Sequence, residues 1–181
     1  GGLFRLTYLA AVFGLVSCFC STSVAQAPED MLEHGRYVFY AAGCISCHTS
    51  DQLMAGGRPL DTPFGRFYPP NITPHREYGI GTWTEEDFVR ALREGLNSQG
   101  EHYYPAFPYP SYTRMTRQDM QALYAYVMTL PASSKERRPH NLQWPFDSRP
   151  LIAHWKVSRF TGGEFSVDPD KSPQWNRGAY L

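Results

Sequence analysis

The chain has 181 residues with 17 basic and 17 acidic side chains, so its formal net charge at pH 7 is zero. This balance gives no reason to expect nucleic acid or an anionic surface as a partner. Aromatic residues make up 15% of the sequence, beside 15 glycines and 15 prolines, which argues against a disordered chain and favours one small domain with long, rigid loops.

Residues 1–25 have the pattern of a signal peptide. Arg5 is their only charge, residues 6–20 form an apolar run, and small or polar residues follow. We expect cleavage after Ala25, because Ser23 and Ala25 are small residues at the two subsites that the peptidase reads. The apolar run is shorter than the roughly 20 residues of a membrane-spanning helix. A lipoprotein signal ending at Cys18 and an uncleaved anchor are the alternatives. The pattern predicts export.

The first helix is predicted from Pro28 to Ala42. Pro28 suits a helix start, and acidic residues follow at the positive end of the helix dipole. Gly35 is costly inside a helix unless another helix packs closely against it. We therefore expect the last helix of the domain to cross the first one at Gly35.

Cys44, Cys47 and His48 form the pattern C-x-x-C-H. This is the attachment motif of c-type haem, in which two thiols add to the haem vinyl groups and the His coordinates the iron. A disulfide or half of a zinc site would explain the two cysteines but not the adjacent His. The motif predicts one covalently attached haem c in this chain.

Met115 is the favoured second axial ligand of the haem iron. It follows residues 104–112, whose prolines forbid a helix and favour a stiff loop that can present a thioether. His102 is the alternative. The other methionines lie too near the motif or fit a helical core pattern: Met31, Met54, Met120 and Met128.

Two more helices are expected after the long, non-periodic segment 56–83. Thr84, with Asp87 three residues on, starts a middle helix, and Thr116, with Asp119, starts the last one. The buried faces are predicted to contain Phe88, Val89, Leu92 and Leu96 in the middle helix, and Met120, Leu123, Tyr124, Val127 and Leu130 in the last. Pro131 ends the last helix, so three helices surround the haem.

Arg58 and Arg66 are the first candidates for binding the haem propionates, because buried carboxylates need donors. Each could equally be a solvated arginine. Further candidates are Tyr68, Trp83 and Arg93.

Six short motifs lie between the attachment site and the last helix, at residues 57–60, 62–65, 71–74, 79–81, 87–95 and 104–109. Together with C-x-x-C-H they resemble the cytochrome c subunits of membrane-bound bacterial dehydrogenases for alcohols, aldehydes, gluconate and related polyols. The resemblance implies an all-α, class I cytochrome c-like domain. It also implies that the Met of Ser-Tyr-Thr-Arg-Met-Thr, here Met115, is the distal ligand.

The resemblance further implies several haem domains in series. We assign residues 28–131 to a cytochrome c domain and 132–173 to a connector rich in proline and aromatic residues, without helical periodicity. Residues 174–181 are interpreted as the start of a second cytochrome c domain, because Arg177-Gly178-Ala179-Tyr180 is similar to Gly35-Arg36-Tyr37. The full-length protein would carry more haems if it continues.

The function implied is relay of electrons rather than catalysis within this chain. The donor would be a dehydrogenase with pyrroloquinoline quinone or flavin, and the acceptor quinone or an oxidase, in a complex on the periplasmic side of the cytoplasmic membrane. The alternatives are a peroxidase-type haem enzyme with a labile sixth ligand, a free soluble carrier, and a zinc or thiol-redox module.

Overall fold

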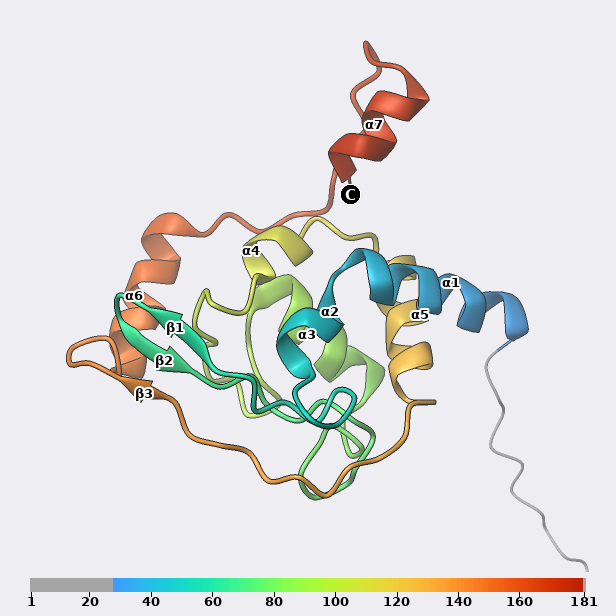
Figure 1. Cartoon of the computed structure of the whole chain (residues 1–181). Helices are drawn as coiled ribbons and strands as arrows, with labels where there is room; N and C mark the ends of the chain where they lie inside the picture. Colours follow the sequence, from blue (N-terminus) through green and yellow to red (C-terminus); the bar gives the residue numbers. More distant parts are fainter. Residues whose placement is uncertain (1–27, 181) are drawn as a thin grey trace, which may run out of the picture.

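The computed structural model describes residues 28–180. The predicted signal peptide, its cleavage after Ala25 and the lipoprotein alternative at Cys18 lie outside these residues. The chain is mostly helical (Figure 1). The helices are α1 (Glu29–Ala41), α2 (Cys44–His48), α3 (Glu85–Glu94), α4 (Tyr109–Tyr112), α5 (Arg117–Val127), α6 (Arg149–Arg159) and α7 (Pro173–Tyr180).

The first and last helices of the predicted domain, α1 and α5, pack against each other. A Cβ atom on Gly35 would lie 2.0 Å from the carbonyl oxygen of Ala122 and 2.8 Å from the Cβ of Tyr126. No side chain fits in that space, so glycine is required for the two backbones to approach. The predicted close contact at Gly35 is confirmed.

The predicted starts of α3 and α5 are also confirmed. The Thr84 hydroxyl accepts a hydrogen bond from the backbone N–H of Asp87, and the Asp87 carboxylate accepts one from the N–H of Thr84, which completes a capping box. The hydroxyl of Thr116 accepts a bond from the N–H of Asp119 at 3.1 Å. Both helices therefore begin where the cap residues predict.

The prediction that Leu96 extends the buried face of the middle helix is wrong. Gly95 adopts a left-handed conformation with φ of 62° and ends α3, as C-terminal glycines commonly do. Leu96 lies beyond the helix and pairs with His102 in an isolated bridge.

The core is formed by α1 and by other residues of the two predicted faces, namely Val38, Phe39, Phe88, Val89, Leu92, Met120, Leu123 and Val127. Tyr124 and Leu130 are only partly buried against this core. The prediction that Pro131 ends the last helix is wrong, because α5 ends at Val127 and Leu130 lies beyond it.

A small antiparallel sheet interrupts the segments expected to be loops. It contains β1 (Leu60–Thr62), β2 (Gly65–Phe67) and β3 (Asn141–Leu142), in the order β1-β2-β3. Gly65 permits the close pairing, because its φ is 117° and an added Cβ would lie 2.4 Å from the carbonyl oxygen of Asn141. The long-range partner of β2 therefore comes from the segment that we interpreted as a connector.

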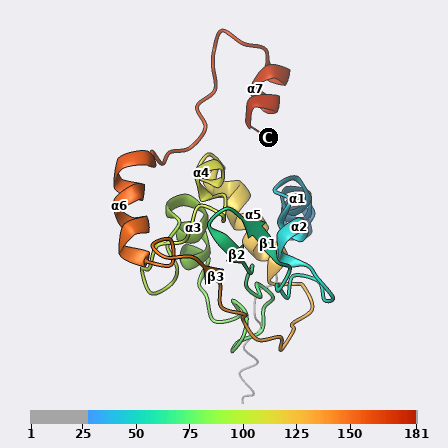
Figure 2. The same ribbon diagram turned by 60° about the vertical axis from the view of Figure 1, so that its left-hand side comes forward.

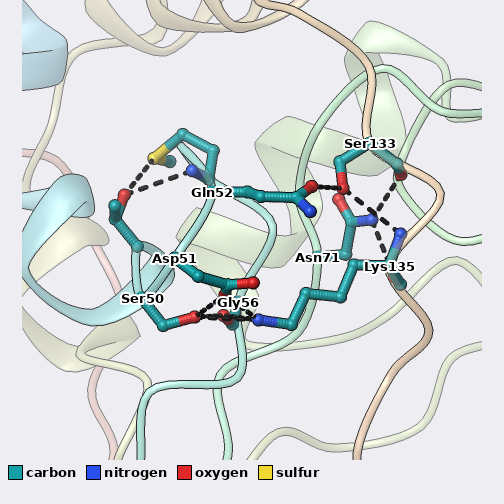
Figure 3. Close-up of polar contacts among 9 residues, drawn as sticks. Ser50, Asp51, Gln52, Gly56, Asn71, Ser133 and Lys135 are labelled. Atoms are coloured by element: carbon teal, nitrogen blue, oxygen red, sulfur yellow. Dashed lines mark hydrogen bonds and ion pairs between the residues drawn. The ribbon is translucent and has the colours of Figure 1, made fainter.

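The chain after α5 is tied back to the loop that follows the attachment motif (Figure 3). The buried amide of Asn71 donates to the carbonyl oxygens of Ser133 at 2.8 Å and Lys135 at 3.0 Å. The Ser133 hydroxyl donates to the Gln52 side chain, and the Lys135 ammonium pairs with Asp51. These bonds direct residues 133–142 across the domain towards β2.

The expectation that residues 132–173 lack a helix is wrong, because α6 forms within them. Pro150 lies in the first turn of α6, where proline is tolerated, so it marks a helix start. The buried Lys156 donates from α6 to the carbonyl oxygens of Glu94 and Gly95 at the end of α3. Figure 2 shows α6 on the flank of the domain beside α3, with α7 on a separate extension.

The helix expected at residues 174–181 is present as α7. The Tyr180 hydroxyl donates to the Asp119 carboxylate and accepts a bond from the N–H of Thr116 at 3.0 Å, which fixes α7 to the start of α5. Its assignment to a second haem domain stays a prediction. Between residues 28 and 180, no helix combines the length and apolar character that crossing a bilayer would need.

Candidate haem-binding site

The attachment motif forms a short helix of its own. Gly43, at φ of 69°, provides the left-handed turn that separates α2 from α1. No disulfide joins Cys44 and Cys47 in the described chain; both are free thiols. Burial raises the pKa of the Cys44 thiol to about 11, so this sulfur reacts poorly in disulfide exchange. Cys47 is exposed.

His48 is fixed in the form that binds a metal. Its Nδ1 lies 2.9 Å from the carbonyl oxygen of Pro70. A carbonyl only accepts, so Nδ1 carries the proton and donates it, and burial lowers the pKa of the imidazole, which keeps the ring neutral. The lone pair of Nε2 is therefore free, oriented by the bond to Pro70.

A cavity of about 570 Å³ lies beside the motif, with Cys44, Cys47 and His48 in its wall. Its volume is in the range of cofactor sites. The rest of the wall is largely apolar and comes from α3, α5 and the loops, including Ile72, Ile80, Phe88, Leu92, Phe107 and Leu123. Two thiols and a neutral imidazole at the edge of an apolar cavity fit a covalently bound haem.

The zinc alternative finds no support in the described residues. Within residues 28–180, no three His, Cys, Asp or Glu side chains gather as a metal site would require. A structural zinc site needs four such ligands.

The two candidates for the sixth ligand, Met115 and His102, are not part of the cavity wall. Met115 is half-buried and packs against the hydrophobic core, while its carbonyl oxygen accepts a bond from Arg93 at 3.1 Å. The expectation that the prolines of residues 104–112 forbid a helix is wrong, because α4 forms at the end of this stretch with Pro110 in its first turn. Phe107 and Tyr112 of the stretch line the cavity. Ligation by Met115 stays a prediction.

The structure does not bring Arg58 or Arg66 to the cavity either. Arg58 donates to the carbonyl oxygen of Ser46 at 2.6 Å, and Arg66 pairs with the exposed Asp61. Of the further candidates, only Trp83 lines the wall.

Three side chains of the basic residue types that the sequence did not single out as site residues do line the cavity: Arg137, His140 and Arg149. They were missed because they belong to the presumed connector and form no known motif. The useful signal was the density of basic residues, aromatic residues and one His just beyond the last helix.

The fold and the site together define a mostly helical protein that binds haem covalently. Residues 32–131 match the cytochrome c family. The chain belongs to this family and carries haem c. The all-α fold class is correct, with the small sheet as an addition.

Relatives extend the likeness over most of the chain. One of the nicotinate dehydrogenase subunits of Pseudomonas putida is 48% identical over 83% of this chain and 13% of its own length. A diheme cytochrome c-type protein of Cereibacter sphaeroides is 41% identical over 96% of this chain and 62% of its own length. The cytochrome c subunit of a Gluconacetobacter polyoxogenes alcohol dehydrogenase (quinone) is 37% identical over 98% of this chain and 39% of its own length. The chain thus spans less than two thirds of each.

Proposed function

We propose that this chain is an electron-relay subunit, which accepts single electrons from a partner dehydrogenase and passes them towards quinone or an oxidase of the respiratory chain. The observation that carries the proposal is the neutral, hydrogen-bonded His48 beside two attachment cysteines in the wall of one apolar cavity. Support for the partner comes from relatives named as subunits of nicotinate and alcohol dehydrogenases.

Haem c, when bound, supplies a one-electron couple at a potential set by its surroundings. The chain's part is to hold His48 in one orientation and to surround the site with side chains that exclude water. Cys47 is exposed, while Cys44 and His48 are more buried. This arrangement brings one edge of the site to the surface, where a partner can approach, and keeps the rest covered.

The partner is proposed to carry pyrroloquinoline quinone or flavin, in a membrane-associated complex on the periplasmic side. The signal-peptide pattern of residues 1–25 supports export, and the word quinone in the name of the alcohol dehydrogenase relative supports the acceptor. The substrate is proposed to be determined by the partner subunit, since the names of the relatives include dehydrogenases of both nicotinate and alcohol.

A redox titration of the purified, haem-loaded chain tests the relay. We expect a reversible one-electron Nernst curve, rapid reduction by reduced phenazine methosulfate, and negligible turnover with hydrogen peroxide. Sustained peroxide turnover at a rate typical of enzymes would reject the relay and favour the peroxidase alternative.

The predicted sixth ligand has its own test. If Met115 ligates the iron, Met115→Leu abolishes the far-red thioether-to-iron charge-transfer band of the oxidised protein, whereas Met128→Leu leaves it unchanged. A wild-type spectrum without the band would reject Met115 as the ligand.

A further inference from the structure

Arg137, His140 and Arg149 line the cavity that contains the attachment motif. All three come from the chain after α5, beyond residues 32–131 that match the cytochrome c family. They are thus the part of the haem site that family membership does not assign.

His140 is held as a hydrogen-bond donor. Its Nδ1 accepts the backbone N–H of Tyr68 at 3.1 Å, and its ring packs edge-on against Phe67 and Tyr104, with centroids 5.2 and 5.6 Å away. Because Nδ1 is an acceptor, the neutral ring carries its proton on Nε2. This atom is therefore a donor and not a free metal ligand, which separates the role of His140 from that of His48.

Arg149 is fixed from two directions. Its Nη1 donates to the carbonyl oxygen of His102 at 2.6 Å, and its guanidinium lies 5.2 Å from the centroid of the Tyr104 ring. These contacts use one of the five N–H donors of the guanidinium and stack its face. The other donors can serve a bound anion.

Arg137 and Arg149 create a positive region around the neutral ring of His140. Burial, together with the charges of Arg137 and Arg149, lowers the pKa of His140 to about 4, so both arginines lie near this ring. In the described chain, no carboxylate lies within ion-pairing distance of either arginine. The acid in the cavity wall is Glu77. Arg137 is exposed and Arg149 is half-buried, so both guanidinium groups keep N–H donors that a bound anion in the cavity can use.

Haem c brings two such anions. Its propionates project from the edge of the macrocycle away from the vinyl groups that the cysteines bind. Arg58 lies on the wrong side for them, because its guanidinium bonds to Ser46, between the two cysteines. Arginine binds carboxylates through two parallel N–H bonds.

We propose that Arg137, His140 and Arg149 bind the two haem propionates, so that the segment after α5 completes the haem site. The cations offset the propionate charge and raise the reduction potential, because they disfavour the extra positive charge of the oxidised haem. Their hydrogen bonds also fix the position of the propionates.

The test uses the full haem-loaded chain with Arg137→Gln, Arg149→Gln and His140→Gln. We expect each arginine variant to lower the equilibrium constant for reduction by about three- to tenfold, and tenfold corresponds to about 59 mV for one electron. The resonance Raman band of the propionate bending mode should shift in all three variants. Haem content per chain should stay at the wild-type value.

Arg66→Gln is the matched control, because it removes the same charge from a side chain that pairs with exposed Asp61. We expect the equilibrium constant for reduction to change by less than twofold and the propionate bending band to stay unshifted. Arg149→Lys should restore most of the potential, since it keeps the charge, but not the Raman band, since it lacks the planar fork.

An unchanged propionate band in Arg137→Gln and Arg149→Gln would overturn the proposal. A shift of the potential no larger than in Arg66→Gln would do the same, as would a band shift in Arg58→Gln alone. A variant with disturbed folding is identified by its melting curve. In that case the potential and the propionate band of Arg149→Lys decide whether the proposal stands.

Discussion

The attachment helix α2 and the returning segment 133–149 line the same cavity, but different forces hold them there. In α2, the two cysteines and the histidine are five residues or fewer apart, and one tertiary bond, from His48 to Pro70, orients the ligand. The returning segment depends on contacts with residues more than 60 positions away, through Asn71, Tyr68 and β2. Covalent chemistry therefore makes α2 robust, while the returning segment relies on the folded domain.

The largest expected effect comes from removing the attachment itself. The double replacement Cys44→Ser and Cys47→Ser should abolish covalent haem, because both thioethers are lost. Denaturing gel electrophoresis with haem staining measures the result. Ser46→Ala, within the same helix, should keep full haem content, since its hydroxyl bonds only locally to Gly43 and Cys47. Haem that survives denaturation in the double variant would contradict the attachment.

The second prediction tests the packing of α1 against α5, which is independent of haem attachment. Gly35→Val places side-chain atoms where a Cβ alone would lie 2.0 Å from the Ala122 oxygen. We expect a loss of at least about 3 kcal/mol in the free energy of unfolding, by overpacking against backbone that cannot yield. Urea unfolding of the haem-loaded chain measures it. Gly178→Ala is the control, with nothing within 4 Å of an added Cβ, and a similar loss there would refute the packing argument.

The third prediction loosens the returning segment at Asn71, a residue of the cavity wall, without removing any residue of the attachment motif. Asn71→Ala removes two donors from the carbonyls of Ser133 and Lys135 and one acceptor from Thr73, all in a buried setting. We expect a loss of about 2–3 kcal/mol in the free energy of unfolding, with covalent haem retained. The exposed Asn141→Ala should change it by less than about 0.5 kcal/mol. Equal effects from the two variants would show that the Asn71 bonds do not secure the segment.

The smallest effect concerns α7. Tyr180→Phe removes the hydroxyl that links Asp119 to the N–H of Thr116, while Asp119 keeps its bond to His34 at 2.6 Å. A loss of about 1 kcal/mol is expected, seen as faster tryptic cleavage at Lys171 and Arg177. Tyr40→Phe, on an exposed residue of α1, should cleave at the wild-type rate. Unaltered cleavage in Tyr180→Phe would mean that this hydroxyl does not hold α7.

The sequence was informative where the physical cause is local. The attachment motif and the capping residues Thr84 and Thr116 depend on residue types at fixed short spacings, and the expected starts of the helices follow from them. The contact at Gly35 is long-range, but a glycine inside a helix is itself a local signal of it. The end of α3 was misjudged because Leu96 fits the apolar period, although Gly95 before it ends the helix.

The site could be predicted on the side of α2 and not on the side of the returning segment. His140 reaches the cavity because β3 pairs with β2 and the N–H of Tyr68 meets its ring. Neither Tyr68 nor β2 is near His140 in the sequence, and a strand of only two residues is too short to give a periodic pattern. Arg58 and Arg66 were natural candidates by proximity to the motif, but local bonds to Ser46 and Asp61 occupy them.

The pairing of β3 with β2 also bears on how such modules can be exchanged between proteins. A recombination event that joined haem units at the end of the family match, Leu130 or Pro131, would separate Asn71 from the carbonyls of Ser133 and Lys135 and leave β2 without its neighbour. The smallest portable unit therefore extends through Leu142 at least, and through Arg159 if α6 is to keep its anchor on α3. Tandem copies of such a unit would therefore each need their own returning segment as well as their own attachment motif.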